Sequence, residues 1–82
     1  MSERKEIGRI THYFPKIGVA VVELSDTIQV GDKILIKGST TEFEQTVESM
    51  QIEHKNIESA GPGQSIGLKV VQRVRENDRV YK

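Results

Sequence analysis

A turn followed by a short strand occurs twice in this 82-residue chain, and the repeat constrains the fold more than any other feature of the sequence. The first copy is Gly31-Asp32 with the run 33–37, and the second is Asn77-Asp78 with the run 79–81. Glycine and asparagine tolerate a left-handed backbone, and an aspartate side chain accepts hydrogen bonds from nearby amides. Alternating apolar and polar residues have the period of a half-buried strand. The two copies predict strands that enter a small closed sheet from the same end.

The rest of the chain also consists of short β-like runs between turn residues, and no stretch has apolar residues at helical spacing. In the first run the buried face stays open, because Ile7 and Tyr13 share one parity and Ile10 and Phe14 the other. In the longest run, 43–52, the parity changes, which predicts a bulge near Glu48 and Ser49. The predicted strands are 7–14, 19–24, 33–37, 43–52, 66–70 and 79–81. Their spacing of roughly eight to twelve residues predicts an all-β fold, a small closed antiparallel β-barrel of about six strands.

The size of the chain, 82 residues and 9.2 kDa, leaves room for one domain with a modest core. We expect residues 1–5 to be a charged N-terminal extension and residues 6–82 a single β-barrel domain. The sequence has no cysteine, which excludes disulfides, a thiolate nucleophile and cysteine-bound metals. Because there is no long apolar run and the N-terminus is charged, we expect a cytoplasmic protein without a membrane partner.

The charges balance, with 12 Lys and Arg against 12 Asp and Glu, so the overall basic character of many nucleic-acid binders is missing. Basic residues gather from residue 69 to the end, whereas glutamates gather between residues 42 and 58. These regions either form separate basic and acidic faces or keep alternate strand positions solvated.

Motifs for catalysis are weak. The glycine-rich segments 38–41 and 61–65 lack the lysine and spacing of a phosphate loop, so we expect this chain alone to bind no nucleotide. A metal or acid–base site would have to use His12, Glu53 and His54. Glu53 and His54 are adjacent and would project to opposite faces of a strand. We therefore predict no catalytic residue, no metal and no cofactor.

A binding surface is the better prediction. Tyr13, Phe14 and Lys16 place two aromatic rings and a cation around one turn, which suits stacking on a base or anchoring in a protein groove. The alternative puts Phe14 in the core and Tyr13 at its rim. Arg73 and Arg75 either share an exposed face that contacts phosphate or pair with acidic residues of the same segment.

The order of the motifs resembles domain 2 of the translation GTPases, the β-barrel of elongation factor Tu. The matching motifs are residues 28–34 with Gly38, and then residues 47–54, 60–68 and 77–80. Residues 11–14 and 43–50 are similar as well to small stand-alone elongation-factor-like proteins and to the C-terminal barrel of collagenase-like peptidase-family proteins.

This resemblance implies a barrel that contacts RNA or the ribosome and, in elongation factor Tu, helps to hold the aminoacyl end of tRNA. Residues 19–23 lack the internal glycine of the family strand that walls the aminoacyl pocket. Our first hypothesis is a non-enzymatic module that contacts RNA or a ribonucleoprotein in translation. The second is a protein-docking or substrate-positioning barrel for a separate peptidase-like or RNA-modifying enzyme. An independent hydrolase would need a histidine–carboxylate cluster that we do not find.

Overall fold

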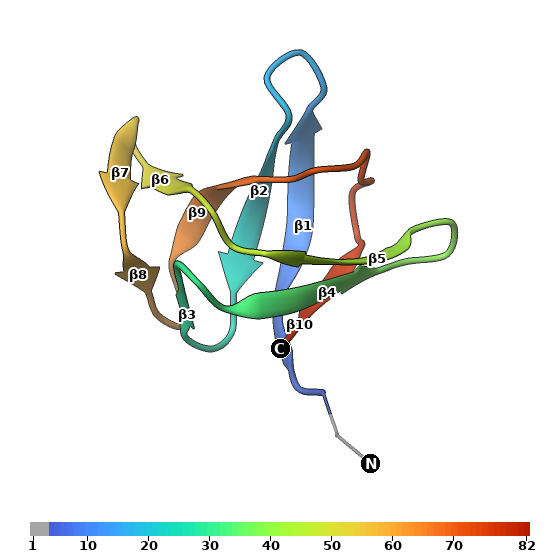
Figure 1. The fold of residues 1–82 in the computed structure, drawn as a ribbon, viewed down its shortest axis with the longest axis horizontal. Helices are drawn as coiled ribbons and strands as arrows, with labels where there is room; N and C mark the ends of the chain where they lie inside the picture. The colour runs from blue at the N-terminus through green and yellow to red at the C-terminus, as the bar shows by residue number, and fades with distance from the viewer. Residues whose placement is uncertain (1–3) are drawn as a thin grey trace.

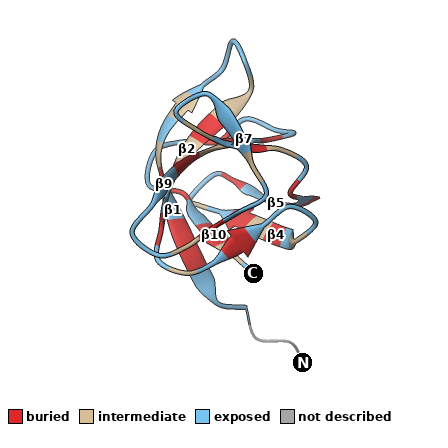
Figure 2. Ribbon diagram, turned by 90° about the vertical axis from the view of Figure 1, so that its left-hand side faces the viewer, coloured by how far each residue is buried: buried red, intermediate tan, exposed pale blue. Residues whose placement is uncertain are grey.

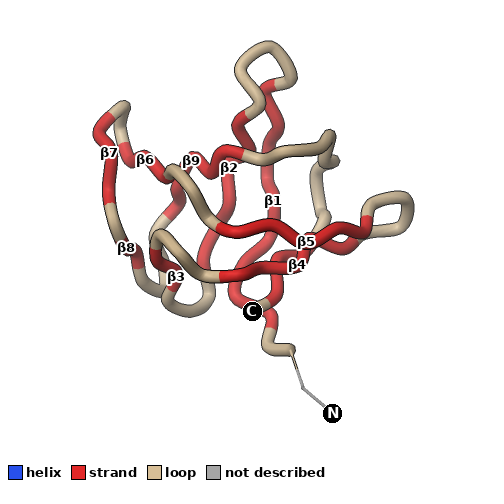
Figure 3. Tube along the Cα trace, viewed as in Figure 1, coloured by secondary structure: helices blue, strands red, loops and turns tan. Residues whose placement is uncertain are grey.

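The computed structural model describes residues 4–82, which form β-strands and turns without a helix (Figures 1 and 3). The strands are β1 (Glu6–Phe14), β2 (Val19–Leu24), β3 (Ile28–Gln29), β4 (Lys33–Lys37), β5 (Glu42–Thr46), β6 (Met50–Ile52), β7 (Lys55–Ile57), β8 (Ser59–Ala60), β9 (Ser65–Lys69) and β10 (Arg79–Tyr81). Residues 1–3 of the predicted extension lie outside the described residues. Lys5 continues the β1–β10 ladder, because its N–H and C=O bond with Lys82 at 3.0 and 2.8 Å.

Eight of these strands form one antiparallel sheet in the order β5-β4-β10-β1-β2-β9-β6-β7, and β3 pairs with β8 in a separate ribbon. The sheet curls into a half-barrel (Figure 1). The half-barrel is open, because within residues 4–82 no ladder joins its end strands β5 and β7. The all-β class is confirmed, whereas the closed six-stranded barrel is wrong. The additional strands β3, β7 and β8 have two or three residues each, which is too short to show an alternating pattern.

A buried side-chain amide ties β5 to the end of β9 and to the residues that follow it. Gln45 is 8% exposed; its Nε2 donates to the Lys69 carbonyl at 2.8 Å, and its Oε1 accepts from the Val71 amide at 3.0 Å. The predicted long strand is interrupted at residues 47–49, where its parity changes, so β5 and β6 lie at distant places in the sheet.

Two register shifts in β1 explain why its sequence showed no single buried face. One lies between Glu6 and Gly8 against β10, and the other between Ile10 and His12 against β2. Each shift changes which parity points inward. As a result Ile7 and Ile10 are both fully buried.

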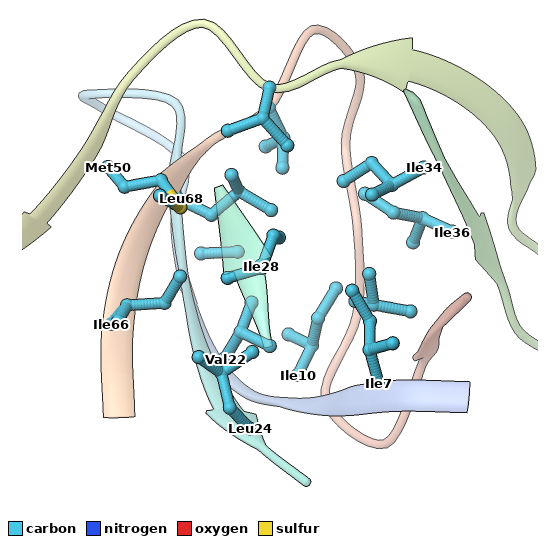
Figure 4. Packing of buried hydrophobic residues seen from close by; sticks show 14 of the residues in the cluster. Ile7, Ile10, Val22, Leu24, Ile28, Ile34, Ile36, Met50, Ile66 and Leu68 are labelled. Carbon is cyan, nitrogen blue, oxygen red and sulfur yellow. The ribbon is translucent and has the colours of Figure 1, made fainter. Parts of the chain in front are cut away.

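The core is largely aliphatic and lies inside the curl of the sheet, where Figure 2 shows the buried strand segments. Each fully buried aliphatic side chain of this kind stabilises the fold by about 1.5–3 kcal/mol. Figure 4 shows the central side chains pointing toward one another: Ile7, Ile10, Val22, Leu24, Ile28, Ile34, Ile36, Met50, Ile66 and Leu68.

The two predicted turns have the same geometry. Gly31 and Asn77 have φ angles of 97° and 73°, in the left-handed region. The carboxylates of Asp32 and Asp78 each accept from the amide three residues earlier, at 3.0 and 2.9 Å. The turns are confirmed, but the strands that follow them, β4 and β10, are antiparallel neighbours and therefore enter the sheet from opposite ends.

Candidate functional site

The β1–β2 hairpin exposes apolar side chains at its tip, which projects beyond the other strands at the top of Figure 1. The turn is closed by the amides of Ile17 and Gly18, which donate to the Phe14 carbonyl at 3.3 and 3.0 Å, and Gly18 has a φ of 66°. Phe14 is 43% exposed and Ile17 is 65% exposed. Two large apolar side chains therefore face the solvent at the same turn.

A groove of about 210 Å³ leads from this tip onto the outer face of β2, β9 and β6. Gly67 keeps it open, because a Cβ at this position would lie 3.3 Å from Cγ1 of Val19. The apolar side chains come from the hairpin and the polar ones from β6 and the turn after it. The lining residues are Phe14, Ile17, Val19, Val21, Gln51, Glu53, His54 and Gly67.

The turn at the polar side of this groove is strained. Glu53 and His54 connect β6 to β7 with φ angles of 51° and 66°. Two-residue hairpin turns of this kind prefer asparagine and glycine, and a left-handed conformation costs other residues about 1–2 kcal/mol each. A hydrogen bond of 3.0 Å from Gln51 Nε2 to Asn56 Oδ1 braces the turn. The expectation that Glu53 and His54 project to opposite faces of a strand is wrong, because both are turn residues.

The two predicted aromatic residues lie on opposite faces of β1. Tyr13 pairs with the buried Ala20 and packs against the core, whereas Phe14 faces outward. The Phe14 ring meets the ring of His12 edge-on, with centroids 4.4 Å apart. The structure thus brings Phe14 and the exposed Lys16 to one turn but directs Tyr13 elsewhere. The alternative prediction, with Phe14 in the core, is wrong, because Phe14 is exposed.

Arg73 and Arg75 lie exposed in the segment between β9 and β10 and do not line the groove. Within residues 4–82 neither guanidinium forms an ion pair, so the expected pairing with neighbouring acidic side chains is not present. The Arg75 amide donates instead to the Asp78 carboxylate. A binding role for Tyr13, Phe14, Lys16, Arg73 and Arg75 stays a prediction.

Ionisable groups are scattered over the surface. The described part of the chain holds no group of three or more His, Asp or Glu side chains placed to bind a metal ion. His12 lies 3.6 Å from a Glu76 carboxylate oxygen, whereas His54 lies on the groove turn. Asp26 has a lowered pKa, because it accepts hydrogen bonds from Lys5 and from the Thr27 amide, and it lies away from the groove.

Sequence reasoning missed most of the groove. One signal was present, since Val19 and Val21 are apolar on the outward parity of β2, where a half-buried strand normally carries polar residues. From the sequence alone, such a run is equally typical of a strand covered on both faces. In the structure Val19 and Val21 are only partly buried and line the groove.

The comparisons with known proteins give a consistent result, although no protein-family model matches the chain. The "Uncharacterized protease MJ0090" of Methanocaldococcus jannaschii is 48% identical over 77 residues, which is 93% of this chain and 19% of that protein. A "Collagenase" of Porphyromonas gingivalis is 35% identical over 82 residues, 98% of this chain and 23% of that protein. The relatives of this chain thus carry the names protease and collagenase. The chain spans about a fifth of the length of these relatives.

Solved structures show the same fold. The C-terminal domain of a Geobacillus thermoleovorans protein described as a U32 peptidase matches with a TM-score of 0.90. The match covers 95% of this chain and 99% of that domain at 23% identity. A second structure of that domain gives a TM-score of 0.85. The half-barrel is thus the fold of the C-terminal domain of a U32 peptidase-family protein.

These findings correct the first functional hypothesis. The relatives are named protease and collagenase, and the matching domain comes from a peptidase-family protein, so the expectation of a translation-factor-like module that contacts RNA or the ribosome is wrong. The peptidase half of the resemblance is supported, whereas the elongation factor Tu type is not.

In the described range there is also no helix with the length and apolar character needed to span a bilayer.

Proposed function

We propose that this chain is a non-catalytic protein-binding domain that works together with a peptidase-type catalytic domain. Relatives named protease and collagenase support the association, because the chain matches about a fifth of their length. The fold of a domain from a U32 peptidase-family protein supports it independently. A domain that accounts for so small a share of its relatives fits an accessory role better than a complete active site.

The observation that carries the proposal is the exposed apolar surface at the hairpin tip and along the groove. Phe14 and Ile17 expose large apolar areas, and Val19 and Val21 continue this surface onto the sheet. Contiguous apolar surface next to a few polar groups marks sites where proteins bind other molecules. The sequence predicts no catalytic residue, so binding is the activity that this surface supports best.

The test is a domain exchange in the Porphyromonas gingivalis collagenase, whose segment matching this chain is replaced by residues 1–82. The native collagenase and a version without that segment are the controls. We expect the exchange to restore collagen cleavage relative to the deletion, mainly through KM, since a binding domain acts on substrate capture. The isolated chain should hydrolyse neither collagen nor casein.

Two results would contradict the proposal. The isolated chain would be an enzyme if it hydrolysed collagen or casein and kept this activity after repurification and after expression in another host. An exchange protein that is folded but no more active than the deletion would remove the link to peptidases.

A further inference from the structure

The groove at the hairpin has the size and chemistry of a site for a few side chains of a peptide. Its volume of about 210 Å³ suits one or two aliphatic side chains. A stable interface between two folded domains buries roughly 800 Å² on each partner, far more than this groove offers. Its apolar part comes from Phe14, Ile17, Val19 and Val21, which favours aliphatic ligand side chains.

The charge of the groove narrows the choice of ligand. Among the described residues that line the groove, Glu53 alone has a formally charged side chain, with histidine taken as neutral. Its carboxylate has no ion-pair partner among residues 4–82. A carboxylate beside apolar surface is complementary to a peptide in which a Lys or Arg side chain follows aliphatic residues. A peptide with an acidic residue at that position would be repelled by the carboxylate.

The backbone of the turn supports a role for the Glu53 side chain. Glu53 and His54 occupy two left-handed positions for which asparagine and glycine are better suited. Strain of this kind collects at binding sites, where the surrounding structure holds it in place. The side chain of Glu53 is thus kept at the groove at a conformational cost.

We propose that the groove binds an extended segment of the peptidase's protein substrate, in which aliphatic side chains and a Lys or Arg side chain lie on the same face. The proposal rests on the proposed function and names its ligand. In an extended peptide, side chains two positions apart point to the same side. The aliphatic side chains lie on Val19 and Val21, while the cation lies beside Glu53.

The test uses the full 82-residue chain and the acetylated, amidated peptide Ser-Leu-Ser-Leu-Ser-Arg-Ser, with binding followed by NMR through the amides of Gln51 and Gly67. Matched peptides carry Glu in place of Arg, or Ser in place of both Leu. We expect the Arg peptide to bind roughly two- to fivefold more tightly than the Glu peptide, the range of an exposed ion pair. Loss of both leucines should weaken binding about tenfold or more.

A charge reversal decides whether Glu53 is the recognised group. In Glu53→Lys the preference should invert, so that the Glu peptide binds more tightly. The matched control Glu58→Lys makes the same change at an exposed residue that does not line the groove, and it should keep the preference for Arg. Equal binding of the three peptides, or a preference that Glu53→Lys leaves unchanged, would overturn the proposal.

The domain exchange in the collagenase separates this proposal from the proposed function. If the exchange restores collagen cleavage and Glu53→Lys or Ile17→Ser leaves KM unchanged in it, the domain serves a peptidase but the groove does not hold the substrate. A folded exchange protein with no restored activity would instead reject the peptidase association itself.

Discussion

The chain has two kinds of turn with left-handed backbone positions, and they differ in how well their residues suit that backbone. The turns at Asp32 and Asp78 place glycine and asparagine at the left-handed positions, and each carboxylate accepts a backbone amide. The turn at Glu53 and His54 holds a similar backbone with two residues that are poorly suited to it. The first kind builds the scaffold, where local preference and fold agree. The second lies on the groove, which is where a departure from local preference is expected at a binding site.

The two aspartate turns also differ from each other in burial. Asp78 is 4% exposed and packs directly against Gly38, whereas Asp32 is more accessible and lies 3.4 Å from Nζ of Lys82. Water can replace the lost acceptor at the accessible Asp32, but not at the buried Asp78. The turn at Asp78 is therefore the more sensitive of the two.

The largest effect is expected from Gly38→Ala. A Cβ at this position would lie 1.8 Å from Oδ1 of Asp78, so the carboxylate would have to leave its place. We expect the free energy of unfolding to fall by about 3 kcal/mol, measured by urea denaturation. Gly61→Ala is the matched control, because among residues 4–82, chain neighbours aside, the new Cβ would come closest to Oε1 of Gln64, at 3.9 Å. Equal stability of the two variants would contradict the packing of Asp78.

Removing each carboxylate in turn should show which of the two turns contributes more to the free energy of unfolding. We expect Asp78→Ala to cost about 2 kcal/mol, because it removes a buried carboxylate and leaves the part-buried Arg75 amide without its partner. Asp32→Ala should cost about 1 kcal/mol, the net value of an ordinary hydrogen bond. Urea denaturation of both variants checks the order, and a larger loss for Asp32→Ala would reverse our comparison.

The strained turn should respond in the opposite direction. Glu53→Asn combined with His54→Gly supplies the residues that two consecutive left-handed positions favour. We expect the free energy of unfolding to rise by about 1 kcal/mol in thermal or urea denaturation. A double variant less stable than the natural chain would show that the turn carries no strain.

A smaller change is expected at the hairpin tip. Ile17 is 65% exposed, so Ile17→Ser should alter the free energy of unfolding by less than about 0.5 kcal/mol. The same change should weaken the binding of the leucine- and arginine-containing peptide. Ile36→Ala, at a fully buried position, should cost about 3 kcal/mol in the same denaturation experiment. Loss of stability in Ile17→Ser comparable to that in Ile36→Ala would mean that the tip is part of the core.

The smallest effect concerns the exposed pair of Lys5 and Asp26, whose atoms Nζ and Oδ2 are 2.6 Å apart. The hydrogen bond from Lys5 lowers the pKa of Asp26 below its ordinary value of 3.8. The pair therefore stabilises the fold above this value and stops doing so as the pH falls through the lowered pKa. We expect the small difference in Tm between the natural chain and Asp26→Asn at pH 7 to disappear in acid. A difference that grows on acidification would contradict the direction of this shift.

The sequence predicted the strands that have clear alternation and the turns that carry their own signal. Residues 19–24 and 33–37 are strands as expected, and the turns at Gly31 and Asn77 have the expected backbone. The open edge of the sheet could not be predicted, because β5 is tied to the end of β9 by one buried amide, that of Gln45, and not by a strand ladder. The direction of Tyr13 and Phe14 could not be predicted either, since the shift near Thr11 is set by pairing with β2.

The candidate site was only partly accessible to such reasoning. Phe14 and Lys16 were placed at one turn, with the burial of Phe14 left open, and in the structure both are exposed. The groove itself also needs Val19, Gly67 and Glu53, which come from three separate segments. Their meeting follows from the order β2-β9-β6 in the sheet, and no local pattern encodes that order.

The most direct test of the relation between the strained turn and binding is one NMR titration of the leucine- and arginine-containing peptide into the natural chain and into the double variant Glu53→Asn, His54→Gly. We expect the more stable double variant to lose the preference for the Arg peptide over the Glu peptide. If the double variant keeps that preference and affinity, the turn plays no part in binding, and the groove is not the site where this domain recognises its ligand.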